Sequence, residues 1–155
     1  HTQSSAASDV YKRQILSYYH FSEEMDTISL SYEERFMRRK KLVSDKGHEF
    51  LVDLDEMKSV LSNQAFKLQS GKLITIKSKK ENLIEIKSKD LNKLIWHIGN
   101  RHIPCQIEAT RILIQSDHII EDMVRRLGGQ TKSVIEQFNP EGGAYGMGRT
   151  HGHKH

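Results

Sequence analysis

The sequence predicts an α+β protein with three parts: a small N-terminal β domain, a ferredoxin-like βαββαβ domain, and a flexible C-terminal tail that contains histidines. Short apolar runs with a period of two fill residues 28–86, apolar residues take helical spacing after Ile86, and the last residues are rich in glycine and histidine. We expect the β domain at residues 15–82, the ferredoxin-like domain at 83–141 and the tail at 142–155.

The first residues contribute nothing to this prediction. Residues 1–14 are small and polar, without apolar periodicity. They look like a translated cloning linker, and a natural disordered leader would look much the same. We therefore leave them out of the predicted fold.

The N-terminal half has the pattern of a sheet with one buried face. Phe50, Val52 and Leu54 occupy alternate positions, and residues 73–77 repeat the same period of two. Turn-forming residues at 45–47 and 69–71 indicate two hairpins. We expect this half to consist mostly of strands.

The C-terminal half alternates strands and helices. The first helix is predicted from apolar residues at helical spacing, which are Leu91, Leu94, Ile95 and Ile98. Ser88 or Asp90 can cap its start, and Gly99 can end it. A second apolar stripe over residues 119–127 predicts another helix, and strands are expected at 83–87, 103–107, 112–114 and 131–138. This order is the split ferredoxin-like arrangement.

Composition bounds the class of protein. No apolar run approaches the ~18 residues that span a bilayer, and no signal segment is present, so we expect a soluble, cytoplasmic chain without a membrane partner. The single Cys105 excludes a disulfide framework within one chain. The formal charge of +4 names no partner by itself.

The tail carries the clearest metal signal. His151, His153 and His155 alternate with Gly152 and Lys154 at the end of a glycine-rich segment. Alternate residues of an extended chain project to the same side, and imidazole suits nickel, copper and zinc. A leftover purification tag is the other reading, but the interruptions do not resemble a run of consecutive histidines, so we favour metal capture.

Three further histidines are candidates. His97 and His102 flank the loop after the first helix. His102 lies just beyond the helix end and can be an ordinary surface histidine or a group that faces a partner subunit. His118 follows Asp117 at the start of the second helix, where capping alone explains the carboxylate. Cys105 falls on the apolar face of a strand, which favours a small buried residue over a nucleophile.

A basic run covers residues 33–41, and such clusters can bind phosphate backbones. A charged edge strand gives the same composition. Because acidic residues at 45, 53, 55 and 56 offset the charge, we favour a protein-facing or solvated strand over a nucleic-acid groove.

Several longer segments together resemble the UreE family, the urease accessory nickel metallochaperones. The resemblance covers nearly everything from about Ser29 onward. It rests on the segments YEERFMRR at 32–39, EFLVDL at 49–54, WHIGNRH at 96–102, DH at 117–118 and NPEGGAYG at 139–146, together with Pro104.

The resemblance implies a fold, a site and partners. It implies a homodimer joined through the ferredoxin-like domains, with an N-terminal domain that binds partner proteins or peptides. His102 matches the family's interface histidine, and His151, His153 and His155 would complete or feed that site. His97 and His118 match accessory ligands. The residue two before His118 is Ser116 rather than a histidine, which puts the accessory site in doubt.

The expected function is therefore delivery of Ni(II) to the urease apoprotein through a GTPase urease accessory protein, without catalysis. Zn(II) or Cu(II) are competing ions. Two other classes remain to be weighed: a basic nucleic-acid-binding module, which would rest on residues 38–41, and a metal-dependent hydrolase, which would rest on the histidines. The sequence contains no H-E-x-x-H pattern, and we expect no nucleic-acid partner.

Overall fold

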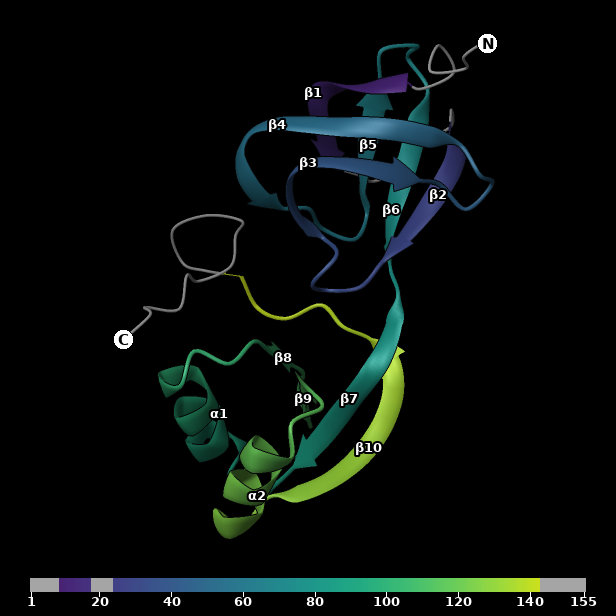
Figure 1. Cartoon of the computed structure of the whole chain (residues 1–155). Helices are drawn as coiled ribbons and strands as arrows, with labels where there is room; N and C mark the ends of the chain where they lie inside the picture. The colour runs from purple at the N-terminus through teal and green to yellow at the C-terminus, as the bar shows by residue number, and fades with distance from the viewer. Residues whose placement is uncertain (1–8, 18–23, 143–155) are drawn as a thin grey trace. The chain divides into compact units, whose positions relative to one another are not determined.

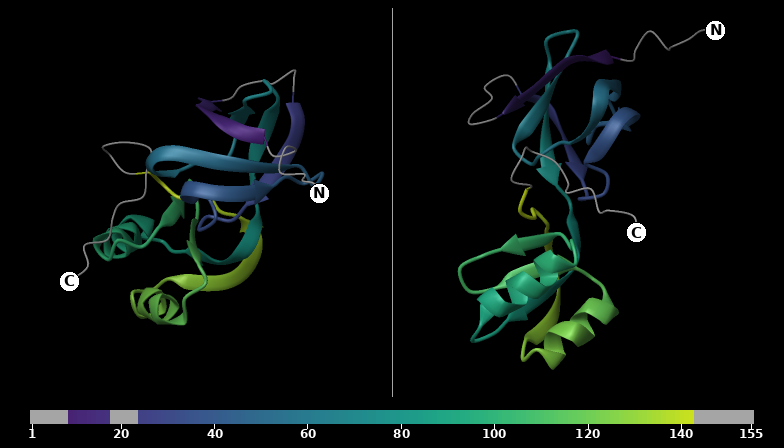
Figure 2. Two further views of the ribbon diagram at one scale, coloured as in Figure 1. Left: turned by 45° about the horizontal axis from the view of Figure 1, so that its top comes forward. Right: turned by 90° about the vertical axis from the view of Figure 1, so that its left-hand side faces the viewer.

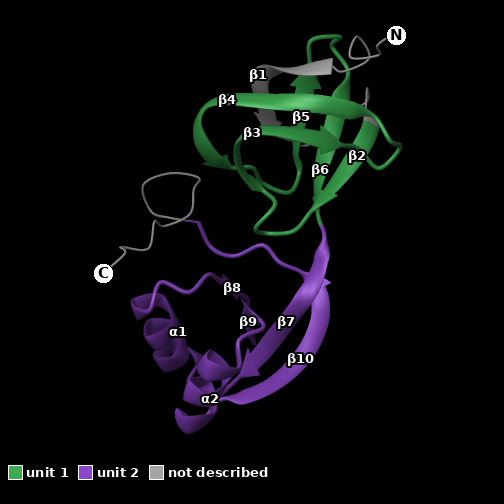
Figure 3. Ribbon diagram, in the orientation of Figure 1, with its two compact units in different colours: residues 1–78 green, residues 79–155 purple. Residues whose placement is uncertain are grey.

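The chain forms two compact units in this computed structural model, one ending at Ser78 and the other beginning at Lys79 (Figures 1 and 3). The structure describes residues 9–17 and 24–142. The junction lies earlier than the boundary we expected between residues 82 and 83. Strand β7 already begins at Lys80, where polar residues pair with β10 and give no apolar signal.

All the secondary-structure elements that the structure describes in unit 1 are strands. They are β1 (Asp9–Ser17), β2 (Glu24–Leu30), β3 (Phe36–Val43), β4 (Glu49–Ser59), β5 (Gln64–Leu68) and β6 (Leu73–Ser78). Their order in the sheet is β2-β6-β5-β1-β4-β3. Strands β1 and β4 pair in parallel, as do β2 and β6, and the other pairs are antiparallel.

The start of β1 corrects one expectation. Residues 9–14 belong to this strand, although we left residues 1–14 out of the predicted fold. The backbone of β1 pairs with β4 and β5, which are distant in sequence. Pairing of that kind leaves no trace in the local pattern of apolar residues.

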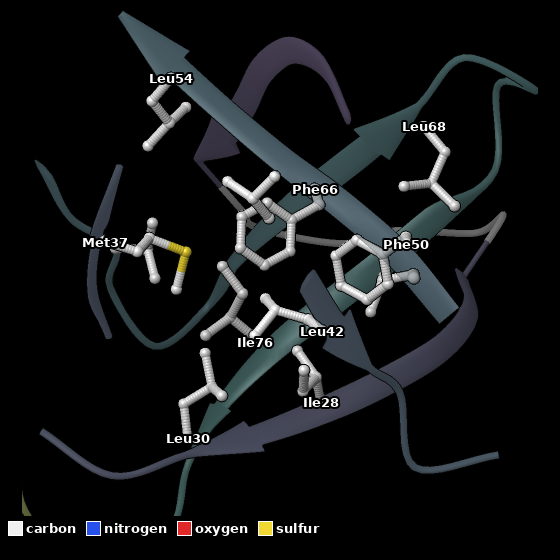
Figure 4. Packing of buried hydrophobic residues seen from close by; sticks show 12 residues of the cluster. Ile28, Leu30, Met37, Leu42, Phe50, Leu54, Phe66, Leu68 and Ile76 are labelled. Carbon is white, nitrogen blue, oxygen red and sulfur yellow. The ribbon is translucent and has the colours of Figure 1, made fainter. Parts of the chain in front are cut away.

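Both predicted hairpins are present. They join β3 to β4 and β5 to β6, and Gly47 and Gly71 supply the left-handed backbone that each turn needs, both with φ 87°. Phe50, Val52 and Leu54 are buried, which confirms the alternation in β4. Figure 4 shows how Phe50 packs near Phe66, with ring centroids 5.5 Å apart.

The alternation predicted for residues 73–77 is wrong. Leu73, Ile74, Thr75 and Ile76 are all buried. Strand β6 is an interior strand with β2 on one side and β5 on the other. Successive side chains of a strand point to opposite faces, so this burial means that both faces of β6 are covered along these residues.

Unit 2 has the predicted order βαββαβ. Its elements are β7 (Lys80–Lys87), α1 (Leu91–Asn100), β8 (Cys105–Ile107), β9 (Ile112–Gln115), α2 (His118–Arg126) and β10 (Gln130–Gln137). The sheet is antiparallel with the order β10-β7-β9-β8. Both helices lie on the same face of this sheet (Figure 2). Leu94, Ile98 and Val124 bring them onto a core formed with the isoleucines of β7 and β9.

The first helix does not end at Gly99 as expected. Helix α1 continues to Asn100, and the residue with left-handed backbone is His102, with φ 58°. Among the described helices, none is long and apolar enough to cross a membrane.

Candidate metal centre

The end of α1 fixes the backbone of His102. The N–H of Ile103 donates to the carbonyl of Ile98 at 3.3 Å, and the N–H of His102 donates to that of Gly99 at 3.0 Å. These two bonds form a Schellman motif, in which the left-handed position is usually a glycine. Here it is His102. The motif therefore places an imidazole where the chain turns away from the helix.

The position of His102 is held by the core beneath it. Ile98 is fully buried, and Ile103 packs against the same apolar cluster. A non-glycine residue in the left-handed region costs about 1–2 kcal/mol, and such conformations persist where the surroundings determine them. The side chain of His102 itself is exposed. The result is an accessible imidazole on a well-fixed turn.

His97 lies on α1, five residues before His102, and faces a groove. Its ring meets Trp96 edge-on, with centroids 5.0 Å apart. The groove has a volume of about 500 Å³ and runs between α1 and α2. Its lining consists of His97, Arg101, Ile119, Ile120, Asp122, Met123, Arg126 and Leu127. His102 does not line it.

His118 is the first residue of α2 and is exposed. The carboxylate of Asp117 accepts from the N–H groups of Ile119 and Ile120, at 2.9 and 3.2 Å. One oxygen of Asp117 is therefore committed to capping the helix, as the sequence predicted. Within the part of the chain that the structure describes, no three histidine, cysteine or acidic side chains gather in a group able to hold a metal.

Cys105 is buried in the core of unit 2, which confirms its predicted place on the apolar face. Burial raises the pKa of its thiol, and the nearby charge of Glu141 raises it further. Both effects disfavour the thiolate, which is the form that binds metal or attacks a substrate. Cys105 is therefore a poor ligand in this conformation.

The root of the tail is attached close to His102. The N–H of Asn139 donates to the side chain of Gln106 at 2.8 Å, and the N–H of Glu141 donates to the carbonyl of Cys105 at 2.9 Å. Cys105 comes only three positions after His102. His151, His153 and His155 lie outside the described residues.

Three carboxylates of unit 2 surround a single arginine. Arg111 bonds to Glu85 at 2.9 Å, to Glu136 at 2.8 Å and to Glu108 at 3.1 Å. Hydrogen bonds from Glu136, Glu85 and Glu108 hold the pKa of Arg111 above its ordinary value, and Arg111 in turn lowers the pKa of Glu136. These carboxylates are neutralised by a cation of the chain itself.

Comparison with known proteins shows the family of the chain. A family model described as the C-terminal domain of the UreE urease accessory protein matches residues 81–155. A urease accessory protein UreE from Ruegeria pomeroyi is 52% identical over 136 residues, which cover 88% of this chain and 91% of the relative. The chain belongs to the UreE family.

Other UreE proteins agree. The one from Rhodobacter capsulatus is 49% identical and covers 87% of this chain and 86% of its own length. The one from Paracoccus denitrificans is 45% identical and covers 79% of each. As a member of this family the chain is an accessory protein of urease maturation and not an enzyme.

The sequence identified the candidate histidines but missed how they are held. The left-handed backbone of His102 carries no signal of its own, because no glycine occupies that position. The groove between α1 and α2 also escaped prediction, since it needs both helices in place. The order βαββαβ predicts that the two helices lie on one face of the sheet. It does not predict which side chains line the groove between them.

Proposed function

We propose that the protein is a nickel metallochaperone whose homodimer binds Ni(II) through His102 of both subunits. The observation that carries this proposal is the exposed imidazole on the left-handed turn after α1. The chain belongs to the UreE family, whose members are named urease accessory proteins. The resemblance to this family implies that the protein delivers nickel to urease. Here Ni(II) is a cargo, and the protein carries out no catalysis on it.

A single imidazole cannot hold the ion for long, so the site needs further ligands. Among the described residues of one chain, His102 belongs to no group of three histidine, cysteine or acidic side chains that could hold a metal. In a symmetric dimer, each subunit presents the same residue across the two-fold axis, so two His102 side chains can share one ion. Histidine nitrogens suit Ni(II), and Zn(II) and Cu(II) compete for the same ligands.

Exposed apolar side chains near this turn support dimerisation through unit 2. Trp96 is 63% exposed on α1, and Ile119 is 69% exposed on α2. Exposed aromatic and aliphatic residues of this size are enriched where proteins associate. Burying them in a dimer would remove apolar surface from water beside the candidate ligands.

The tail supplies further ligands in this proposal. His151 comes nine positions after Gly142. Nine extended residues span up to about 30 Å, so a tail that starts beside Cys105 can bring His151, His153 and His155 to His102. His97 and His118 would bind more weakly, as accessory ligands. Exchange of one ligand at a time lets the ion leave without a large barrier.

Delivery completes the proposal. The dimer would pass Ni(II) in the cytoplasm to the urease apoprotein, through the GTPase urease accessory protein. Because affinity alone ranks Cu(II) above Ni(II), selectivity would come from ligand geometry and from the receiving protein. No nucleic acid and no membrane takes part.

Nickel titration by calorimetry tests the proposal. We would compare the intact chain, His102→Ala, His118→Ala as a matched control, and a chain that ends at Thr150. The tightest site should hold about one ion per dimer and should be lost in His102→Ala but kept in His118→Ala. The shortened chain should bind more weakly at the same stoichiometry. Unchanged binding by His102→Ala would remove the basis for a bridging site.

A further inference from the structure

Four successive cations are exposed on one strand of unit 1. Arg38, Arg39, Lys40 and Lys41 are exposed in β3, whereas Met37 and Leu42 on either side are buried. A half-buried strand would alternate. We call these four residues the basic strip. The pairing of β3 with β4 shifts its register between Met37 and Arg39. Such a shift is typical of a β-bulge, and a bulge interrupts the alternation of buried and exposed residues.

The basic strip lies on a sheet edge. Strand β3 pairs with β4 and comes last in the order of the described strands (Figure 1). At its end, the N–H of Ser44 donates to the carbonyl of His48, so the backbone of Ser44 faces β4. Successive residues of a strand face opposite ways, and the N–H of Lys41, three positions earlier, therefore points away from β4. None of the described strands pairs with this side of β3, so its backbone groups can meet a further strand.

The charges of the basic strip are mostly uncompensated. Lys41 lies 3.5 Å from Glu49, but both side chains are more than half exposed and such pairs contribute little. Within the described part of the chain, Arg38, Arg39 and Lys40 form no ion pair. Arg39 stands opposite Asp53 in the ladder without pairing to it. These cations are free to meet an anionic partner.

We propose that the edge of β3 binds an extended acidic segment of a partner protein, which adds to the sheet as a further strand. The main chain of the segment would bond to the outer edge of β3, and its carboxylates would meet the basic strip. This interaction goes beyond nickel binding and does not depend on it. It names the strand edge of unit 1 and the charge of the segment that this edge would bind.

The width of the basic strip favours a peptide over a nucleic acid. The strip is one strand wide, and the neighbouring strand β4 exposes Asp53, Asp55 and Glu56. A phosphate backbone lying across this face would meet those carboxylates, whereas a single strand added beyond β3 would not. Charged residues on an edge also prevent aggregation, and if that were their whole role no peptide would bind.

Fluorescence anisotropy with the full chain tests the proposal. The probe is a labelled peptide of alternating glutamate and valine with the length of β3, which is 8 residues. The double variant Arg39→Glu with Lys40→Glu reverses two charges of the basic strip. The matched control, Lys72→Glu with Lys77→Glu, reverses two exposed charges of the same unit outside the strip. A thermal melt of each variant establishes that it is folded, and the milder Arg39→Gln with Lys40→Gln replaces the first variant if it is not.

The expected result is binding by the wild-type chain, a loss of about tenfold or more in the strip variant, and a change within about twofold in the control. The same peptide N-methylated at alternate residues should bind at least about tenfold more weakly, because it cannot pair along its backbone. Equal binding of the methylated peptide, equal loss in both variants, or no binding at all would overturn the proposal. Tighter binding of an oligothymidine would assign the strip to nucleic acid instead.

Discussion

At the scale of single residues, His102 shows how a ligand can be held by backbone geometry. The Schellman bonds and the buried Ile98 and Ile103 hold a left-handed conformation that glycine adopts more easily. Histidine at this left-handed position makes the fold less stable than glycine would. Selection for an imidazole at the end of α1 would explain why histidine is present. Sequence reasoning found this residue through its resemblance to a family motif. It could not find the conformation, because φ at a non-glycine residue is set by the packed helix.

Replacing His102 by glycine should stabilise unit 2. Relief of the left-handed strain gains about 1–2 kcal/mol, and the greater freedom of glycine in the unfolded chain costs about 0.5–1 kcal/mol. The net gain in the free energy of unfolding should be about 0.5–1 kcal/mol. Urea unfolding followed by the fluorescence of Trp96, the single tryptophan, measures it. His97→Gly, inside the helix, should lower stability by about 1 kcal/mol. A lower free energy of unfolding in His102→Gly would contradict the claim that the backbone of His102 is strained.

Asp26 gives a residue-scale prediction in unit 1. Its carboxylate is buried and accepts from the hydroxyl of Ser44 and from the N–H groups of Thr27 and Lys46. Burial alone would raise its pKa, but these hydrogen bonds outweigh burial and the pKa is lowered. The ionised form is therefore favoured by folding. Its contribution is present above the unfolded pKa of about 3.9 and is lost as pH falls through the lower folded value.

The variant Asp26→Asn tests this linkage. At neutral pH it should lower the free energy of unfolding by about 1–3 kcal/mol, because an amide nitrogen faces donors that need an acceptor. The difference from the wild type should shrink below about pH 4, where the aspartate also takes up a proton. Urea unfolding followed by far-ultraviolet circular dichroism over this pH range measures it. A difference that stayed constant down to pH 2 would rule out the proposed role of the carboxylate.

At the scale of elements, periodicity predicted which segments are helices and strands better than it predicted where they end. The apolar spacing of α1 identified Leu94 and Ile98 as buried, and the turn residues identified both hairpins. Gly99 was expected to end α1 and does not, because the chain reverses at His102. Strand β1 gave no signal, because its partners lie far away in the sequence.

Two glycines near the helices should respond oppositely to alanine. A Cβ on Gly99 would meet nothing within 4 Å, so Gly99→Ala should stabilise α1 by about 0.5–1 kcal/mol. A Cβ on Gly129 would lie 2.5 Å from Cγ1 of Val124 and 3.1 Å from Cδ1 of Leu94. Both side chains are fully buried, so Gly129→Ala should cost about 1–3 kcal/mol. Trp96 fluorescence in urea compares them, and a destabilised Gly99→Ala would mean that α1 ends before Gly99.

At the scale of the whole molecule, the order of elements in unit 2 followed from the sequence, whereas its assembly did not. The order βαββαβ follows from alternating periodicities, each of which is local. The proposed dimer would bury exposed residues such as Trp96 and Ile119. Ile119 belongs to the same apolar stripe as core residues of α2 and differs from them only in its burial. The metal centre that we propose exists only in that assembly. Its test must therefore count ions and chains together.

Native mass spectrometry during a nickel titration makes that count directly. The account predicts a dimer that takes up one Ni(II) first, and a His102→Gly dimer that takes up none at the same free nickel concentration. The His118→Ala dimer should load like the wild type. Loading of one tightly held ion per separate chain, or an unchanged first ion in the His102→Gly dimer, would contradict a nickel site shared between two His102 side chains.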